Sequence, residues 1–368
     1  MNQLDAQETH GDTTDRQEPL VLPSLGHVED VARSSTSRGD RLVAFIGAAV
    51  VVALVIVYGA WQWQTLKPVT PHVVVAVPVA PRQPSVPNPY ASVPLDARAA
   101  IVYDVRANRP LFKRNSDAQL PLASLTKLMT SLVAVESLST NTRIAVSPYA
   151  IDTEGDSGLF ANETWKLGDL VSFTLLTSSN DGADAVAAAV GGIWQTTPEI
   201  SPVYEHVDSF VSKMNLRARE LGLVKTKYNN PTGLDEYDGE DGGLGSARDM
   251  AILITYLWEQ HPEAIRDTTM PTRVFRSEDG FVHKGENTNE YVTSTPGILA
   301  SKTGYTDLAG GNLAILYNAG LDHPIAVVVL GSTREGRFKD VQKLVDATYR
   351  YEASGWYEYE VAGSTSPL

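Results

Sequence analysis

The chain has 368 residues, with 44 acidic and 30 basic side chains and a formal net charge of −14. This charge argues against nucleic-acid binding, because contacts to phosphate groups need a basic surface. The sequence contains no cysteine, which excludes disulfides, thiolate metal sites and a cysteine nucleophile.

The N-terminal part is predicted to be a tail followed by a membrane-spanning helix. Residues 1–41 are rich in Asp, Glu, Thr, Ser and Arg and show little apolar periodicity, so we expect disorder there. Residues 42–60 carry no charged side chain and are nearly all apolar. At the rise of an α-helix they span about 28 Å, close to the thickness of the hydrocarbon core of a bilayer.

The charges around this helix predict its orientation. Arg33, Arg38 and Arg41 precede it and Lys67 follows it, which favours a cytoplasmic N-terminus. A cleaved signal peptide is the alternative, but it needs a short basic leader and small residues before the cut. Here 41 mostly polar residues come first and Tyr58 disrupts the small-residue pattern, so we favour an uncleaved, single-pass anchor.

Composition also divides the rest of the chain. The stretch from Pro68 to Pro94 contains eight prolines, both ends included, so residues 61–95 are expected to form an extended linker. Residues 96–355 are long enough to bury a full hydrophobic core, and we expect one folded domain there. Residues 356–368 are expected to be a C-terminal tail.

Hydrophobic periodicity predicts the elements of this domain. The predicted strands cover residues 99–105, 110–113, 296–304, 312–318 and 324–331. The predicted helices cover residues 122–138, 169–177, 182–190, 204–221, 246–260 and 336–351. Strands at both ends with helices between them predict a mixed α+β fold, in which an antiparallel sheet flanked by helices is interrupted by an all-helical subdomain.

Ser124 and Lys127 lie three residues apart near the start of the first predicted helix. Residues at this spacing share a helix face, so the ammonium group of Lys127 can reach the hydroxyl of Ser124. Serine becomes a good nucleophile when a neighbouring base takes its proton. Lysine can be that base if burial or a second cation, here Lys302, lowers its pKa. The alternative is that Ser124 is an ordinary helix N-cap.

Two further polar fragments follow, Ser178-Ser179-Asn180 and Lys302-Thr303-Gly304. The first precedes a predicted helix, and the second ends a predicted strand. Gly304 has no side chain and would let a substrate backbone approach the strand closely. Two alternatives stay open here. Ser178 could simply cap the following helix. Ser179 could transfer protons in its place if the loop is in a different register. Lys302 alone could be a solvated strand residue.

In this order the three fragments resemble the signature of penicillin-binding proteins and class A β-lactamases. Residues 96 to 350 as a whole resemble the D-alanyl-D-alanine carboxypeptidases, which are low-molecular-mass penicillin-binding proteins. The segments that extend the resemblance are residues 100–112, 120–130, 230–235 and 246–251. The resemblance implies the β-lactamase/transpeptidase-like fold.

The resemblance also implies roles for individual residues. Ser124 would be the acylated nucleophile and Lys127 its base. Ser178 would relay a proton to the leaving amine, and Asn180 would orient Lys127 and the substrate amide. Lys302 and Thr303 would hold the substrate carboxylate beside Gly304, and the backbone N–H groups of Ser124 and Tyr305 would stabilise the oxyanion. Arg248 would add charge near the carboxylate, or would lie in a structural ion pair instead.

The implied substrate is a peptidoglycan stem peptide ending in D-Ala-D-Ala, at the outer face of a bacterial cell membrane. β-Lactam antibiotics would acylate the same serine. No cofactor is implied. The seven histidines form no zinc-binding motif, so no catalytic metal is expected either.

Other outcomes are open on the same fold. An endopeptidase would cut a cross-link, and a transpeptidase would pass the acyl group to an amine. A class A β-lactamase needs a Glu-x-x-Leu-Asn-like segment, which is absent around residues 212–221. An inactive wall-binding scaffold is the alternative from another class. The chain also departs from the family's pattern, with Ser179 where β-lactamases often carry Asp and with an acidic, glycine-rich stretch at 235–245.

Overall fold

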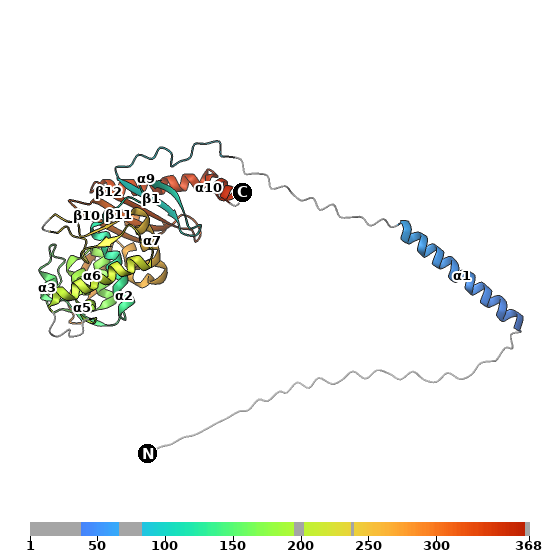
Figure 1. Cartoon of the computed structure of the whole chain (residues 1–368), viewed down its shortest axis with the longest axis horizontal. Helices are drawn as coiled ribbons and strands as arrows, with labels where there is room; N and C mark the ends of the chain where they lie inside the picture. Colours follow the sequence, from blue (N-terminus) through green and yellow to red (C-terminus); the bar gives the residue numbers. More distant parts are fainter. Residues whose placement is uncertain (1–37, 66–82, 195–201, 237–238, 365–368) are drawn as a thin grey trace, which may run out of the picture. The chain divides into compact units, whose positions relative to one another are not determined.

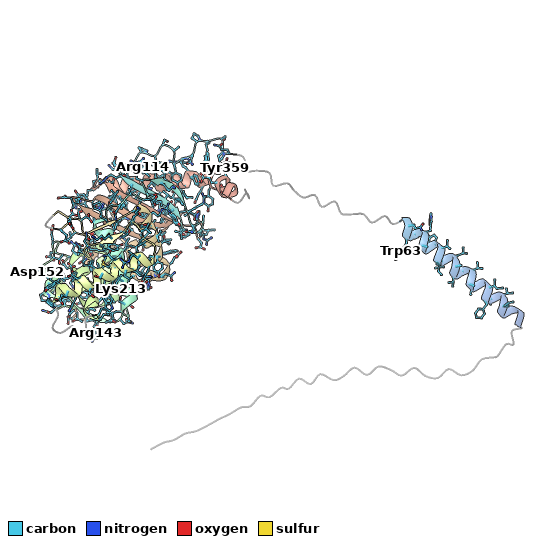
Figure 2. All side chains as sticks on the ribbon, viewed as in Figure 1. Trp63, Arg114, Arg143, Asp152, Lys213 and Tyr359 are labelled. Carbon is cyan, nitrogen blue, oxygen red and sulfur yellow. The ribbon has the colours of Figure 1, made fainter. Side chains whose placement is uncertain are left out.

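A computed structural model describes residues 38–65, 83–194, 202–236 and 239–364 (Figure 1). The chain divides into two compact units near residue 77. In the first unit, helix α1 (Arg38–Thr65) is long and apolar enough over Leu42–Gln64 to cross a membrane, by length and composition. Its apolar side chains are exposed, Trp63 among them (Figure 2). The predicted tail and much of the predicted linker, residues 1–37 and 66–82, lie outside the described residues.

A five-stranded antiparallel sheet forms one half of the second unit, with the strand order β10-β11-β12-β1-β2. Ala99 pairs with Leu330, so strands from the two ends of the domain lie side by side within the sheet. The strands are β1 (Ala99–Asp104), β2 (Arg109–Arg114), β10 (Ile298–Thr306), β11 (Gly310–Asn318) and β12 (Pro324–Ser332).

Helices cover both faces of this sheet, which explains why its central strands are continuous apolar runs. In β12, Ala326 and Val328 belong to the core that includes α7 (Ala247–Gln260). Val327 and Val329 belong to the second core, which includes α9 (Gly336–Ala353). Successive side chains of a strand point to opposite faces, so one strand serves both cores. Figure 1 shows α9 and α7 on opposite sides of the strands.

The segment between β2 and β10 forms the helical half. Its helices are α2 (Lys127–Ser137), α3 (Pro148–Ile151), α4 (Leu167–Thr177), α5 (Asn180–Gly192), α6 (Val203–Glu220) and α8 (Pro262–Ile265). Short strands pair within it: β3 (Leu120–Pro121) and β6 (Lys227–Tyr228) with β7 (Gly243–Gly245), β4 (Arg143–Ala145) with β5 (Thr164–Lys166), and β8 (Thr272–Arg276) with β9 (Val282–Glu286). The predicted fold class, a sheet interrupted by a helical subdomain, is confirmed.

The two ends of the domain differ from expectation. Tyr90, expected in the linker, is buried against the sheet half, and its hydroxyl donates to Thr348 Oγ1 at 2.8 Å. Residues expected in the C-terminal tail form helix α10 (Trp356–Ser364). Trp356 Nε1 donates to the carbonyl of Val86 at 2.9 Å. Both differences have the same cause, because large aromatic side chains bury enough apolar area to order the segments that carry them.

Replacing Tyr90 by alanine tests whether residues 83–95 stabilise the domain. The Tyr90 ring stacks on Phe112 at 5.6 Å between centroids and lies 5.2 Å from the ring of Tyr351. We expect the free energy of unfolding to fall by about 3 kcal/mol, as is usual when a large core aromatic is removed. Chemical denaturation measures this, with the exposed Val86→Ala as a control that should shift it by less than about 0.5 kcal/mol. The prediction would be contradicted if Tyr90→Ala lowered the free energy of unfolding as little as Val86→Ala does.

Candidate active site

Ser124 lies in a tight turn just before α2. The predicted helix over 122–138 begins instead with a 3₁₀ turn, Ala123–Thr126, and the α-helix starts at Lys127. Ala123 adopts a left-handed conformation, with φ of 49°, which is costly for a residue with a side chain. Asn312 on β11 stabilises the turn by donating from Nδ2 to the carbonyls of Pro121 and Leu122, both at 3.0 Å. The sheet therefore holds the nucleophile turn in a strained geometry.

Lys127 is fully buried and its ammonium group donates three hydrogen bonds. The acceptors are Ser124 Oγ at 2.9 Å, Asn180 Oδ1 at 2.6 Å and the carbonyl oxygen of Thr232 at 2.7 Å. All three are neutral groups. Burial lowers the pKa of Lys127 to about 7, although the charges of Asp184 and Asp181 oppose this shift. A lysine with this pKa can take up a proton from the adjacent hydroxyl near neutral pH.

The two serines of the second fragment have different contacts. Ser178 ends α4 with φ of 62°, and its hydroxyl accepts a hydrogen bond from Lys302 Nζ at 2.8 Å. Ser179 is buried and caps α5, with its Oγ accepting from the backbone N–H of Gly182 at 2.8 Å. The alternative in which Ser178 caps this helix is therefore wrong, because the cap is Ser179. The left-handed conformation of Ser178 leaves its own hydroxyl facing the site.

A segment that the sequence analysis did not assign supports this loop. Ser157 Oγ lies 2.6 Å from Ser179 Oγ and donates to Asp181 Oδ2 at 2.8 Å. Asn180 Nδ2 donates to the carbonyl of Glu154 at 2.8 Å. No sequence spacing points to these contacts, because residues 154–157 lie more than twenty positions before their partners.

Lys302 lies on β10 and is also buried. Its Nζ donates to Ser178 Oγ and to the carbonyl of Thr303, both at 2.8 Å. Burial holds the pKa of Lys302 well below its usual range, and the positive charges of Lys127 and Arg337 act in the same direction. Thr303 Oγ1 lies 2.6 Å from Thr288 Oγ1. An anion placed here would relieve the repulsion among these cations.

Gly304 packs against the turn that carries Ser124, a contact that the sequence did not predict. A Cβ atom on Gly304 would lie 2.9 Å from the carbonyl oxygen of Leu122 and 3.1 Å from the amide nitrogen of Ser124. The close approach that needs glycine is therefore made by the protein's own backbone, in addition to any substrate. The next residue, Tyr305, is 42% exposed, and the guanidinium of Arg334 lies over its ring at 5.2 Å.

Arg248 lies in an ion pair, which is one of the two alternatives for this residue. Its Nε pairs with Asp117 Oδ1 at 2.7 Å, and its backbone N–H donates to the carbonyl of Ser116 at 3.0 Å. It is therefore engaged in a surface ion pair at the start of α7. Besides Lys127, a second cation acts on Lys302, namely Arg337 at the start of α9, which is buried and donates from Nη1 to the carbonyl of Gly304 at 2.8 Å. Arg337 was not among the predicted site residues, because burial of an arginine leaves no local pattern.

The antiparallel sheet, the inserted helices and the contact of Ser124 with the buried Lys127 place the chain in the penicillin-binding class of proteins. The ampicillin-bound penicillin-binding protein D2 from Listeria monocytogenes superposes with a TM-score of 0.55 and 30% identity, over 70% of this chain and 98% of that one. The D-alanyl-D-alanine carboxypeptidase DacD from Francisella tularensis gives 0.62 and 25% identity, over 75% of each chain.

The sequence profile described as D-alanyl-D-alanine carboxypeptidase matches residues 84–334, and the chain belongs to this family. DacF from Bacillus subtilis is 30% identical over 72% of this chain. A D-alanyl-D-alanine endopeptidase from Pseudomonas aeruginosa is 30% identical over 66% of this chain and 75% of its own length. The match to DacF covers 65% of the length of that relative.

Proposed function

We propose that this protein is a membrane-anchored serine D-Ala-D-Ala carboxypeptidase that removes the terminal D-alanine from peptidoglycan stem peptides. The observation that carries the proposal is the 2.9 Å contact between Ser124 Oγ and the buried Lys127, whose pKa is lowered to about 7. Membership of the carboxypeptidase family supports the same substrate class.

In the proposed reaction, Lys127 accepts the proton of Ser124 Oγ as this oxygen attacks the carbonyl carbon of the penultimate D-alanine. The backbone N–H groups of Ser124 and Tyr305 stabilise the oxyanion that forms. Ser178 relays a proton to the leaving amine as the C–N bond breaks, and Asn180 holds Lys127 in place. Water then hydrolyses the Ser124 ester, which releases the shortened peptide and restores the hydroxyl.

The proposed binding mode places the terminal carboxylate at Lys302 and Thr303. Lys302 donates to neutral oxygens only, and Arg337 adds a second buried positive charge nearby. A carboxylate would supply the missing negative charge. Since β-lactams carry a comparable carboxylate beside their reactive amide, we expect them to acylate Ser124. The crystal structure of the Listeria protein in its ampicillin-bound form supports this expectation.

We further propose the membrane topology. Residues 1–41 would be a cytoplasmic tail, residues 42–60 a single-pass anchor, and the domain that follows the linker would lie outside the membrane. Helix α1 supports the anchor by its length and composition. The substrate supports the orientation, because peptidoglycan lies outside the cytoplasm.

The deciding experiment measures release of D-alanine from a peptide ending in Lys-D-Ala-D-Ala by the full chain in detergent. Ser124→Ala should abolish release and acylation by labelled penicillin. Ser139→Ala, at an exposed loop position, is the matched control and should leave both unchanged. Release that persists in the Ser124→Ala variant would refute the proposed nucleophile, and failure of the parent to release D-alanine or bind penicillin would refute the function.

An endopeptidase is a second candidate, because some relatives carry that name. A cross-linked stem-peptide dimer offered in the same assay separates the two activities. Faster cleavage of the dimer than of the free terminus would favour the endopeptidase.

A further inference from the structure

A cavity of about 460 Å³ opens beside the catalytic lysine and is not used by the proposed mechanism. It lies between the end of α3, the first turns of α5 and the loop at residues 230–236. Two of its lining residues connect it to the site. Thr232 accepts a hydrogen bond from Lys127, and Asp184 lies one turn after Asn180 on α5. A substrate group in this cavity would therefore lie next to the reacting atoms.

The cavity is strongly acidic. Its twelve lining residues include no lysine, arginine or histidine and five carboxylates, which are Asp152, Glu154, Asp184, Asp235 and Glu236. Asp235 and Glu236 already accept hydrogen bonds, from Thr306 and Leu308 and from Asn230 respectively. Asp152 and Glu154 are exposed, and Figure 2 shows Asp152 at the surface beside α3. The chemistry of the lining selects a cation.

Asp184 is an incompletely satisfied carboxylate in the wall of this cavity. It is only 6% exposed, and Oδ2 accepts from Thr153 Oγ1 at 2.6 Å. Oδ1 has no hydrogen-bond partner among the described residues, and the three hydrogen bonds of Lys127 go to other groups. Burial raises the pKa of Asp184 to about 6, against the opposing effects of Thr153 and Lys127. A buried carboxylate in this state gains much from an ammonium group that enters the cavity.

The contacts that run from Lys302 to the rim of the cavity indicate which part of the substrate reaches it. This is the part on the N-terminal side of the bond that is cut. Lys302 contacts Ser178, two residues before Asn180, and Asn180 contacts both Lys127 and Glu154 at the rim of the cavity. A peptide with its terminal carboxylate at Lys302 and its next carbonyl at Ser124 continues toward its N-terminus past Asn180. The side chain of the third residue from the C-terminus then lies over the cavity.

We propose that this cavity is a specificity subsite for a primary ammonium group on the side chain of that third residue, with Asp184 as its main partner and Asp152 and Glu154 at its mouth. The proposal rests on the proposed function and names the substrate class more closely. A metal ion is disfavoured as the occupant, since no group of three His, Cys, Asp or Glu in the described part of the chain is placed to hold one.

The test compares two peptides, acetyl-Lys-D-Ala-D-Ala and acetyl-norleucine-D-Ala-D-Ala, which differ only in the side-chain amine. We expect the full chain to show a kcat/KM about tenfold or more higher for the lysine peptide, as for one buried charge-assisted contact. Asp184→Asn should bring this ratio close to one. The ratio cancels any effect of the variant on Lys127 and on acylation itself. Asp346→Asn, an equal charge change at an exposed position on α9, should keep the parent's ratio.

A double variant, Asp152→Asn with Glu154→Gln, alters exposed rim residues only and covers the case in which Asp184→Asn does not fold. We expect it to lower the ratio about threefold, as for two partly solvated charges. Equal hydrolysis of the two peptides by the parent would overturn the subsite while the carboxypeptidase function stands. Hydrolysis of neither peptide would overturn the proposed function and the subsite with it.

Discussion

Replacement of Lys127 by methionine should lower kcat/KM for D-alanine release by about 10³-fold, within the range that general bases contribute. Methionine fills a similar volume but cannot accept the proton of Ser124. Because burial lowers the pKa of Lys127 to about 7, the neutral amine that acts as base predominates above this pH. The parent's kcat/KM should therefore rise as the pH increases through about 7, and the residual activity of the variant should lack this rise.

Two controls make this result specific to Lys127. Lys113→Met removes an exposed lysine on β2 and should leave both the rate and the pH profile unchanged. A thermal melt of Lys127→Met reports whether the variant is folded. A folded Lys127→Met variant with the rate and the pH profile of the parent would show that another group is the base.

Replacement of Lys302 by methionine should lower activity while raising stability. Loss of the cation should reduce kcat/KM for the D-Ala-D-Ala peptide by about 10²-fold, the usual cost of removing a buried charged partner. The same peptide with a C-terminal amide lacks the carboxylate and should be hydrolysed more slowly by the parent. Its kcat/KM should therefore fall much less on replacement of Lys302. The ratio of kcat/KM between the two peptides therefore measures carboxylate recognition directly.

The free energy of unfolding of Lys302→Met should rise by about 1–2 kcal/mol, since a buried cation with neutral partners is replaced by an apolar side chain. The sign follows from the pKa of Lys302, which is lower in the folded than in the unfolded protein. Protonation then favours the unfolded state, and this penalty is present at neutral pH. A fall in the free energy of unfolding, with an unchanged ratio of kcat/KM between the acid and amide peptides, would mean that Lys302 has a structural role only.

Hydrophobic periodicity correctly predicted the helices and strands whose buried residues recur at regular spacing. The central strands and helices α2, α7 and α9 follow their hydrophobic patterns, so their positions agree with the structure within a few residues. The hairpin β8–β9 was missed, because Val274 and Val282 point outward and each strand has few buried residues. Helix α10 was missed because its packing depends on residues 83–95, distant in the sequence.

The residues of the site also divide into those with a local sequence pattern and those whose partners are distant in the sequence. Ser124, Lys127, Ser178, Asn180 and Lys302 form recognisable local fragments, and the structure brings them together. Arg248 also belongs to a family-like fragment, yet its partner Asp117 lies far away in the sequence. Arg337 and Asp184 act through burial and through neighbours on other elements, which no local spacing encodes. Sequence patterns thus identified the residues proposed to act on substrate better than the residues that influence the charges of the site.

The pairing of β1 with β12 has a consequence for biosynthesis. Ala99 pairs with Leu330, so β1 has no partner on that side until nearly all of the domain has been synthesised. Pairings between such distant residues form slowly, and an unpaired strand edge invites aggregation meanwhile. Lys302 also comes far later in the chain than Ser124, so an unfinished polypeptide carries Ser124 without the strand that completes its site. The complete site therefore forms late, together with closure of the sheet.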